Sequence, residues 1–161
     1  MDEWLQGVAD WLNTLSIHRT VQDTEWVVPA VQSVHIVGVA IVLTAALIIA
    51  LRGLEVTGTH WSLARWSHRF HSSTIFALWM LLATGLVMVL AEPERELLNW
   101  IFRAKMLTVI VTLVIASVLG RRLRNTRNNR PVGAGVRLLA VLVLLLWVGV
   151  ATAGRWIAYA G

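Results

Sequence analysis

One histidine stands inside a long apolar stretch, where an ionisable side chain is costly and so suggests a function. His35 follows Trp26 by nine residues, about 13 Å along a helix from a membrane surface marked by that tryptophan. A neutral imidazole is a common ligand of haem iron and other metals. Gln32 shares its helix face, and Gly38 is expected to leave room for a flat group beside the ring. His35 is therefore predicted to be either a metal or haem ligand or a histidine hydrogen-bonded to a neighbouring helix.

Several other polar side chains are expected near the depth of His35. Lys105 lies five residues past Trp100, about 7 Å below the surface, and Arg103 lies just above it. Arg155 ends the last apolar stretch. These three cations could bind carboxylates such as haem propionates through charge-assisted hydrogen bonds. They could instead pair with the neighbouring acids, which are Glu92, Glu94 and Glu96.

Two further histidines are expected at a different depth. His71 precedes Glu92 by 21 residues, which places it about 18 Å deeper than His35. The two axial ligands of one iron lie at nearly equal depth, so His35 and His71 cannot share a haem. His68 and His71, three residues apart on one helix, cannot bind opposite faces of one macrocycle. They are predicted to form a polar turn at the membrane surface or to flank a second site.

The elements that position these residues follow from composition. The 161 residues are 57% hydrophobic and 14% charged, with a mean hydropathy of +0.69. A soluble domain carries about a quarter charged residues. Four apolar stretches approach or exceed the ~20 residues needed to cross a bilayer, at about 27–51, 73–91, 104–120 and 138–158. The sequence thus predicts an all-α integral membrane four-helix bundle, as a single domain over residues 1–161.

Residues 1–15 show a different pattern. Apolar side chains recur at helical spacing on one face, and polar ones fill the other. The apolar positions are Trp4, Leu5, Val8, Trp11, Leu12 and Leu15. This pattern predicts an amphipathic helix lying in the membrane interface.

The charges predict an orientation. Residues 52–72 and 120–137 together hold nine basic residues and one acid, whereas the remainder holds five basic residues and eight acids. The positive-inside rule places the two basic loops in the cytoplasm and both termini in the periplasm, in a bacterial inner membrane. Arginines between two spans are typical of topology determinants that touch anionic lipid, so no nucleic-acid partner is expected.

Several classes of chemistry are excluded. The chain has no cysteine, which excludes disulfides, thiolate metal sites and cysteine nucleophiles. It has no phosphate-binding loop and no nucleophile elbow, and all nine acids lie outside the predicted spans.

The stretches TEWVVPAVQSVHIVGVAIVLTAALIIALRGLE, TGLVMVLAEPE and NWIFRAKMLTVIV resemble an uncharacterised bacterial family of four-helix membrane proteins. More distantly, the layout is similar to the HemJ-type protoporphyrinogen oxidase and to the membrane domain of copper-resistance protein D. In the HemJ type, a histidine of the first helix and a lysine of the third are important and haem b is bound. His35 and Lys105 are the matching positions.

Two functions are therefore expected. One is a haem-b-binding subunit that passes electrons within a larger assembly or to quinone. In it His35 is an axial ligand, Lys105 or Met88 lies opposite or the sixth position is open, and Arg103 and Arg155 hold the propionates. The other is a cofactor-free accessory or assembly subunit, whose helix faces bind a protein partner or a second copy. Porphyrinogen oxidation and transport are further alternatives.

Overall fold

The computed structural model describes residues 2–56, 63–125 and 133–157. Within these residues the chain forms seven α-helices, which confirms the predicted all-α class. The helices are α1 (Asp2–Thr14), α2 (Ser16–Asp23), α3 (Val27–Gly53), α4 (Leu63–Ala91), α5 (Pro93–Leu97), α6 (Trp100–Asn125) and α7 (Ala134–Ile157).

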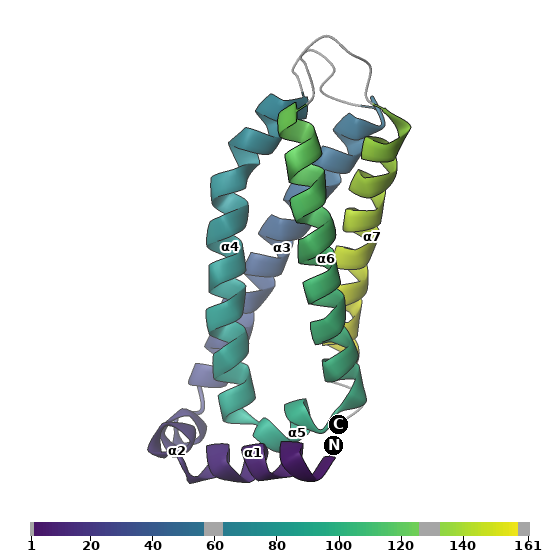
Figure 1. Cartoon of the computed structure of the whole chain (residues 1–161). Coiled ribbons are helices and arrows are strands. Elements are labelled where there is room, and N and C mark those ends of the chain that lie inside the picture. Colours follow the sequence, from purple (N-terminus) through teal and green to yellow (C-terminus); the bar gives the residue numbers. More distant parts are fainter. Residues whose placement is uncertain (1, 57–62, 126–132, 158–161) are drawn as a thin grey trace.

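Four of these helices are long and apolar enough to cross a membrane. The segments that qualify are Val27–Gly53, Arg69–Ala91, Trp100–Leu123 and Ala134–Trp156. They run alongside one another, while the three short helices gather at one end (Figure 1). The protein is therefore a multi-pass membrane protein, as predicted. We call the end with α1, α2 and α5 the capped end, and the opposite end, which carries Arg52, Arg69, Arg121 and Arg137, the arginine end.

The third span is longer than hydropathy indicates. The prediction covered residues 104–120, whereas α6 runs over Trp100–Asn125. Arg103 and Arg121 lower the hydropathy at both ends. Arginine and lysine nevertheless favour helix, and their apolar stems reach along the bundle while the charged heads stay near water. Hydropathy thus marks where the apolar part of the helix ends, and the helix continues beyond it.

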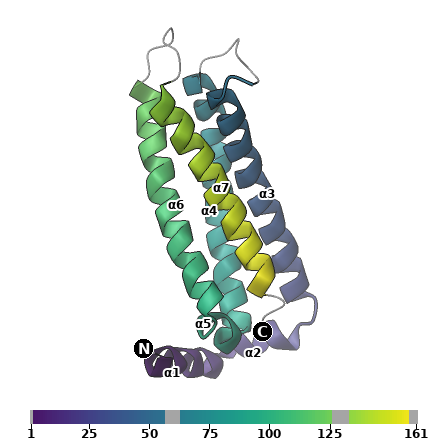
Figure 2. The same cartoon turned by 90° about the vertical axis from the view of Figure 1, so that its right-hand side faces the viewer.

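The four long helices do not form an evenly closed ring. Helix α3 packs along both α4 and α7, and α7 packs along α6, whereas α4 and α6 contact each other little. Figure 2 shows α7 crossing in front of the bundle with α6 and α3 on either side. Small residues on the buried face of α3 allow the close approach of its neighbours. They are Gly38, Ala45, Ala46, Ala50 and Gly53.

The packed apolar core lies in the middle of the bundle and toward the arginine end. Its buried members are Val42, Ala46, Ala77, Leu119, Leu123, Ala140, Val143, Trp147 and Val150. The half of the bundle nearer the capped end holds polar side chains instead, and these form the candidate site described below.

Helix α1 lies across the capped end, at a steep angle to the long helices (Figure 1). It packs on α5, where Ala9 is fully buried and Asn13 Nδ2 donates to Glu94 Oε1 at 3.0 Å. Trp4 and Trp11 are 71% and 60% exposed. The predicted amphipathic helix is therefore present, and its apolar surface is divided between contact with α5 and exposure. Its place in the membrane interface stays a prediction.

Helix α2 closes the capped end of α4. Pro93 has no N–H to continue α4, which ends at Ala91 and leaves carbonyls without helical donors. His18 Nδ1 donates to the Leu90 carbonyl at 2.7 Å, and Gln22 Nε2 donates to the Ala91 carbonyl at 3.0 Å. His18 is buried. Two side chains one turn apart on α2 thus replace the missing donors.

Replacing His18 with leucine is expected to lower the free energy of unfolding by about 1–3 kcal/mol, because a partly buried carbonyl loses its donor. Thermal unfolding in detergent measures this change. His18→Asn places an amide N–H near the position of Nδ1 and should keep most of the stability. Equal losses in both variants would mean that ring packing, and not the hydrogen bond, stabilises this end.

The arginine end of α3 is closed by an unusual residue. Glu55 N–H donates to the Arg52 carbonyl and Val56 N–H to the Leu51 carbonyl, a pattern in which the residue after the helix takes a left-handed conformation. Glu55 has a φ of 62°, where glycine is usual. Its carboxylate lies 3.0 Å from Arg137 Nη2 of α7. This ion pair joins the ends of α3 and α7 and gives a reason for an acid at this position.

Candidate functional site

His35 lies on the buried side of α3, one turn before Gly38 and two turns before Val42. Its Nδ1 atom is 2.7 Å from Oγ1 of Thr84, which α4 presents at the same level. Both side chains are partly buried. The predicted intramembrane histidine therefore faces the inside of the bundle and is held by a neighbouring helix.

The hydrogen bonds of Thr84 indicate which nitrogen of His35 carries the proton. Thr84 Oγ1 also lies 2.7 Å from the Met80 carbonyl, one turn back on α4. A carbonyl only accepts and a hydroxyl has one proton, so Thr84 donates to Met80 and accepts from His35 Nδ1–H. In a neutral imidazole this arrangement leaves the lone pair on Nε2. That nitrogen is then available to a metal or to a hydrogen-bond donor.

Two glycines near His35 differ in the space they leave. A Cβ at Gly38 would lie 3.0 Å from Cγ of Leu81 and 3.1 Å from Cε of Met80. The expectation that Gly38 leaves room beside the ring is wrong, because α4 side chains fill that space. Gly85 is the glycine beside the ring: a Cβ there would lie 3.9 Å from Cε1 of His35.

Lys105 reaches the same region from α6. It is seven residues before Thr112 and fourteen before Leu119, both of which are buried, so it lies on the side of α6 that faces the bundle. A Cβ at Gly154 of α7 would lie 3.1 Å from Lys105 Nζ, so the ammonium group occupies space that glycine leaves open. The charge of Lys105 is also close enough to interact with His35.

Glu96 of α5 adds an acid at the capped end. Its carboxylate interacts with the charge of Lys105, and it is partly buried. Burial raises the pKa of Glu96, an effect that the positive charges of Lys105 and Arg95 oppose and the negative charge of Glu92 reinforces. We call His35, Thr84, Lys105 and Glu96 the polar cluster. Gly85 and Gly154 lie beside it.

The other predicted site residues are more dispersed. Met88 is partly buried on α4, one turn beyond Thr84, and so borders the polar cluster. Gln32 is exposed on α3, one turn before His35. Arg155 is exposed in the last turn of α7. The structure thus places Lys105 near enough for its charge to act on His35 and leaves Gln32 and Arg155 exposed.

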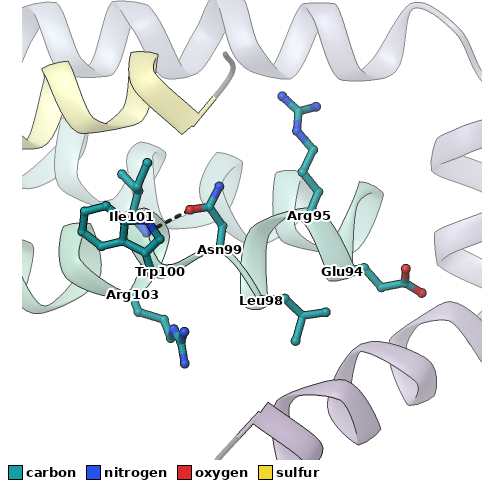
Figure 3. Close-up of a pocket in the computed structure, with 7 residues that line it drawn as sticks. All are labelled: Glu94, Arg95, Leu98, Asn99, Trp100, Ile101 and Arg103. Carbon is teal, nitrogen blue, oxygen red and sulfur yellow. Dashed lines mark hydrogen bonds between the residues drawn. The ribbon is translucent and has the colours of Figure 1, made fainter. Parts of the chain in front are cut away.

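Arg103 lies at a separate surface depression. It is two residues before Lys105, so the two side chains leave α6 about 200° apart. A shallow pocket of about 630 Å³ is lined by Glu94, Arg95, Leu98, Asn99, Trp100, Ile101 and Arg103. Asn99 Oδ1 accepts the Ile101 N–H at 2.9 Å and so caps the start of α6 (Figure 3). Arg95 and Arg103 point to opposite sides in this view.

The family model for the family of unknown function DUF6644 matches residues 14–160. The chain belongs to this family. The predicted membership of an uncharacterised family is thereby confirmed, while the likeness to the HemJ type and to copper-resistance protein D is not part of this match. No curated protein matches the sequence, and no solved structure matches it.

Metal ligands in this DUF6644 protein are sparse. In residues 2–56, 63–125 and 133–157 there is no group of three or more His, Asp or Glu side chains that could hold a metal ion.

His71, the deeper histidine whose side chain the structure describes, lies away from the polar cluster. His71 is exposed on α4, thirteen residues before Thr84, which corresponds to about 20 Å along the helix. The side chain of His68 lies outside the described part of this DUF6644 protein, so the proposed polar turn stays a prediction.

Proposed function

We propose that this membrane protein binds haem b in the capped-end half of its bundle, with His35 as an axial ligand, and serves as an electron-transfer subunit. The observation that carries the proposal is the hydrogen bond between His35 Nδ1 and Thr84. A histidine that ligates a metal usually donates its other ring N–H to a fixed acceptor, which orients the ring. Thr84 provides that acceptor and leaves the lone pair on Nε2.

The surrounding residues fit a porphyrin. Gly85 faces Cε1 of the imidazole without a side chain, and α4 and α6 contact each other little along their length. The long helices are apolar, as a macrocycle requires, and Lys105 provides a cation whose charge acts on His35. Bound haem iron would supply one-electron transfer. The resemblance to the HemJ type depends on the same pair, His35 and Lys105, and supports the proposal.

The visible spectrum of the protein purified from haem-replete cells tests this function. We expect a Soret band, and bands that change on reduction with dithionite, at about one haem per chain. Addition of haemin to protein prepared without haem should restore them. No Soret band under either condition would overturn the proposal.

Replacing Thr84 with valine is expected to weaken haemin binding about ten- to a hundredfold, because the His35 ring loses its acceptor and its fixed orientation. Haemin titration followed at the Soret band measures the affinity. Thr84→Ser keeps the hydroxyl and should bind as the natural chain does. The matched control is Thr108→Val, because Thr108 of α6 makes the same kind of bond to its own helix, at 2.8 Å from the Ala104 carbonyl. An unchanged affinity in Thr84→Val would contradict the role given to Thr84.

The alternative is a cofactor-free accessory subunit, and one observation favours it. Gly149 of α7 is exposed and a Cβ there would meet nothing within 4 Å, while Ala153 follows one turn later. Small residues at this spacing let helices of membrane proteins approach closely. A missing Soret band together with copurifying membrane proteins in a gentle detergent would favour this function. A free monomer without pigment would count against both.

A further inference from the structure

Lys105 is a cation on the buried side of a membrane helix. Its ammonium group carries three donors and needs acceptors when it leaves water. Among the residues that the structure describes, no acceptor lies within hydrogen-bonding distance of Nζ and no carboxylate lies within 4 Å. Charges in such positions are expensive and are retained where they have a function.

Glu96 only partly compensates this charge. The carboxylate and the ammonium group interact, but they do not form a direct ion pair. Glu96 belongs to α5 at the mouth of the bundle, whereas Lys105 lies on the second turn of α6. The Glu96 carboxylate therefore partly offsets the positive charge of Lys105, but it is too far away to accept a hydrogen bond from the ammonium group.

The ammonium group of Lys105 lies against α7, beside a residue that has no side chain. Gly154 provides the space on the side of α7, where a Cβ would lie 3.1 Å from Nζ. The charge of Lys105 acts on His35, whose Nδ1 donates to Thr84. Helices α4 and α6 contact each other little along their length.

We propose that Lys105, with Gly154 beside it, forms a subsite for the carboxylate of a hydrophobic ligand that enters from the bilayer. The subsite takes one carboxylate group of the ligand, because a single ammonium group is present to pair with it. The apolar faces of α4 and α6 indicate a hydrophobic body. This inference rests on the proposed function only where the carboxylate is a haem propionate. A fatty acid carries the same chemistry and is the second source.

In this proposal Lys105 binds the ligand carboxylate, the role that the sequence predicted for Arg103 and Arg155. Arg103 leaves α6 on the opposite side and lines the surface pocket, and Arg155 is exposed at the end of α7. The charge of Lys105 acts on His35. A ligand held by His35 would therefore meet its carboxylate partner at Lys105.

Two pairs of probes test the subsite on the full-length protein in lipid nanodiscs. The first pair is haemin and haemin dimethyl ester, and the second is a fluorescent long-chain fatty acid and its methyl ester. Each ester keeps the hydrophobic body and removes the negative charge. In at least one pair, the natural chain should bind the acid about ten- to a hundredfold more tightly than the ester, the range expected for a charge-assisted hydrogen bond.

Variants of Lys105 locate the effect. Lys105→Met has a side chain of similar length without charge and should bind the acid as weakly as the ester, with ester binding unchanged. Lys105→Arg should keep the preference for the acid. The matched control is Arg121→Met, at the arginine end of the same helix, which should bind like the natural chain. Size-exclusion chromatography checks that each variant is folded. If Lys105→Met is unfolded, the comparison of acid and ester on the natural chain alone tests the subsite.

The outcomes separate this inference from the proposed function. One outcome is that haemin does not bind, while the fatty acid binds more tightly than its ester and Lys105→Met removes that difference. This result would refute the haem site and support the subsite. A Soret band with equal affinities for acid and ester in both pairs would support the haem site and refute the subsite. A preference that persists in Lys105→Met, or no binding by any of the four probes, would also refute the subsite.

Discussion

The Soret band should disappear when His35 is replaced by alanine. No other described histidine lies near the polar cluster: His18 donates to a carbonyl at the end of α4, and His71 is exposed far along α4. Iron would therefore lose its only imidazole at this level. Spectra of the natural and variant chains, prepared with haemin in parallel, measure the loss.

A cavity variant separates ligation from folding. His35→Gly removes the imidazole, and millimolar free imidazole can then occupy its place beside Thr84. We expect imidazole to restore the Soret band in His35→Gly, because the acceptor on Thr84 remains. His71→Ala is the control and should keep the natural spectrum. A band that survives unchanged in His35→Ala would exclude His35 as the ligand, even if haem is bound elsewhere.

The second large effect is expected from Gly38→Val, at the closest approach of α3 and α4. A Cβ at Gly38 would already be 3.0 Å from the Leu81 side chain, and valine adds two further methyl groups. Overpacking of this kind costs about 1–3 kcal/mol when side chains can move, and more when helices must separate. We therefore expect a clear loss of thermal stability in detergent.

The same substitution should also affect the site. Gly38 lies three residues after His35, and Leu81 lies three residues before Thr84, so the two contacts are one turn apart on the same pair of helices. Separating α3 from α4 would lengthen the 2.7 Å bond between His35 and Thr84 and weaken haemin binding. Gly149→Val is the matched control on an exposed face of α7. If both valine variants unfold at the same temperature, the close approach at Gly38 does not stabilise the bundle.

Much of this architecture follows from the sequence. Hydropathy over 18 or more residues is a strong signal, and the four spans were predictable for that reason. The inward direction of His35 was predictable as well, because it shares a helix face with the small residue Gly38. The separation of Arg103 from Lys105 could have been derived in the same way, since residues two apart cannot share a helix face.

Other features depend on contacts between distant segments. Nothing in the pattern around His18 indicates that it would donate to Leu90, 72 residues away. Gly154 was not recognisable as a neighbour of Lys105, because the packing of α7 on α6 decides which glycine meets the ammonium group. Glu55 could not be identified as a left-handed residue, since only the position of Arg137 explains an acid there.

The bonds from α2 to α4 also constrain the order in which the protein can be assembled. His18 and Gln22 are synthesised long before the carbonyls of Leu90 and Ala91 to which they donate. Helices α1 and α2 therefore cannot complete these hydrogen bonds until α4 has been inserted and the chain has turned at Pro93. During that interval their apolar side chains have no protein surface to cover them. A chaperone or the membrane surface would have to shield this segment until the second span arrives.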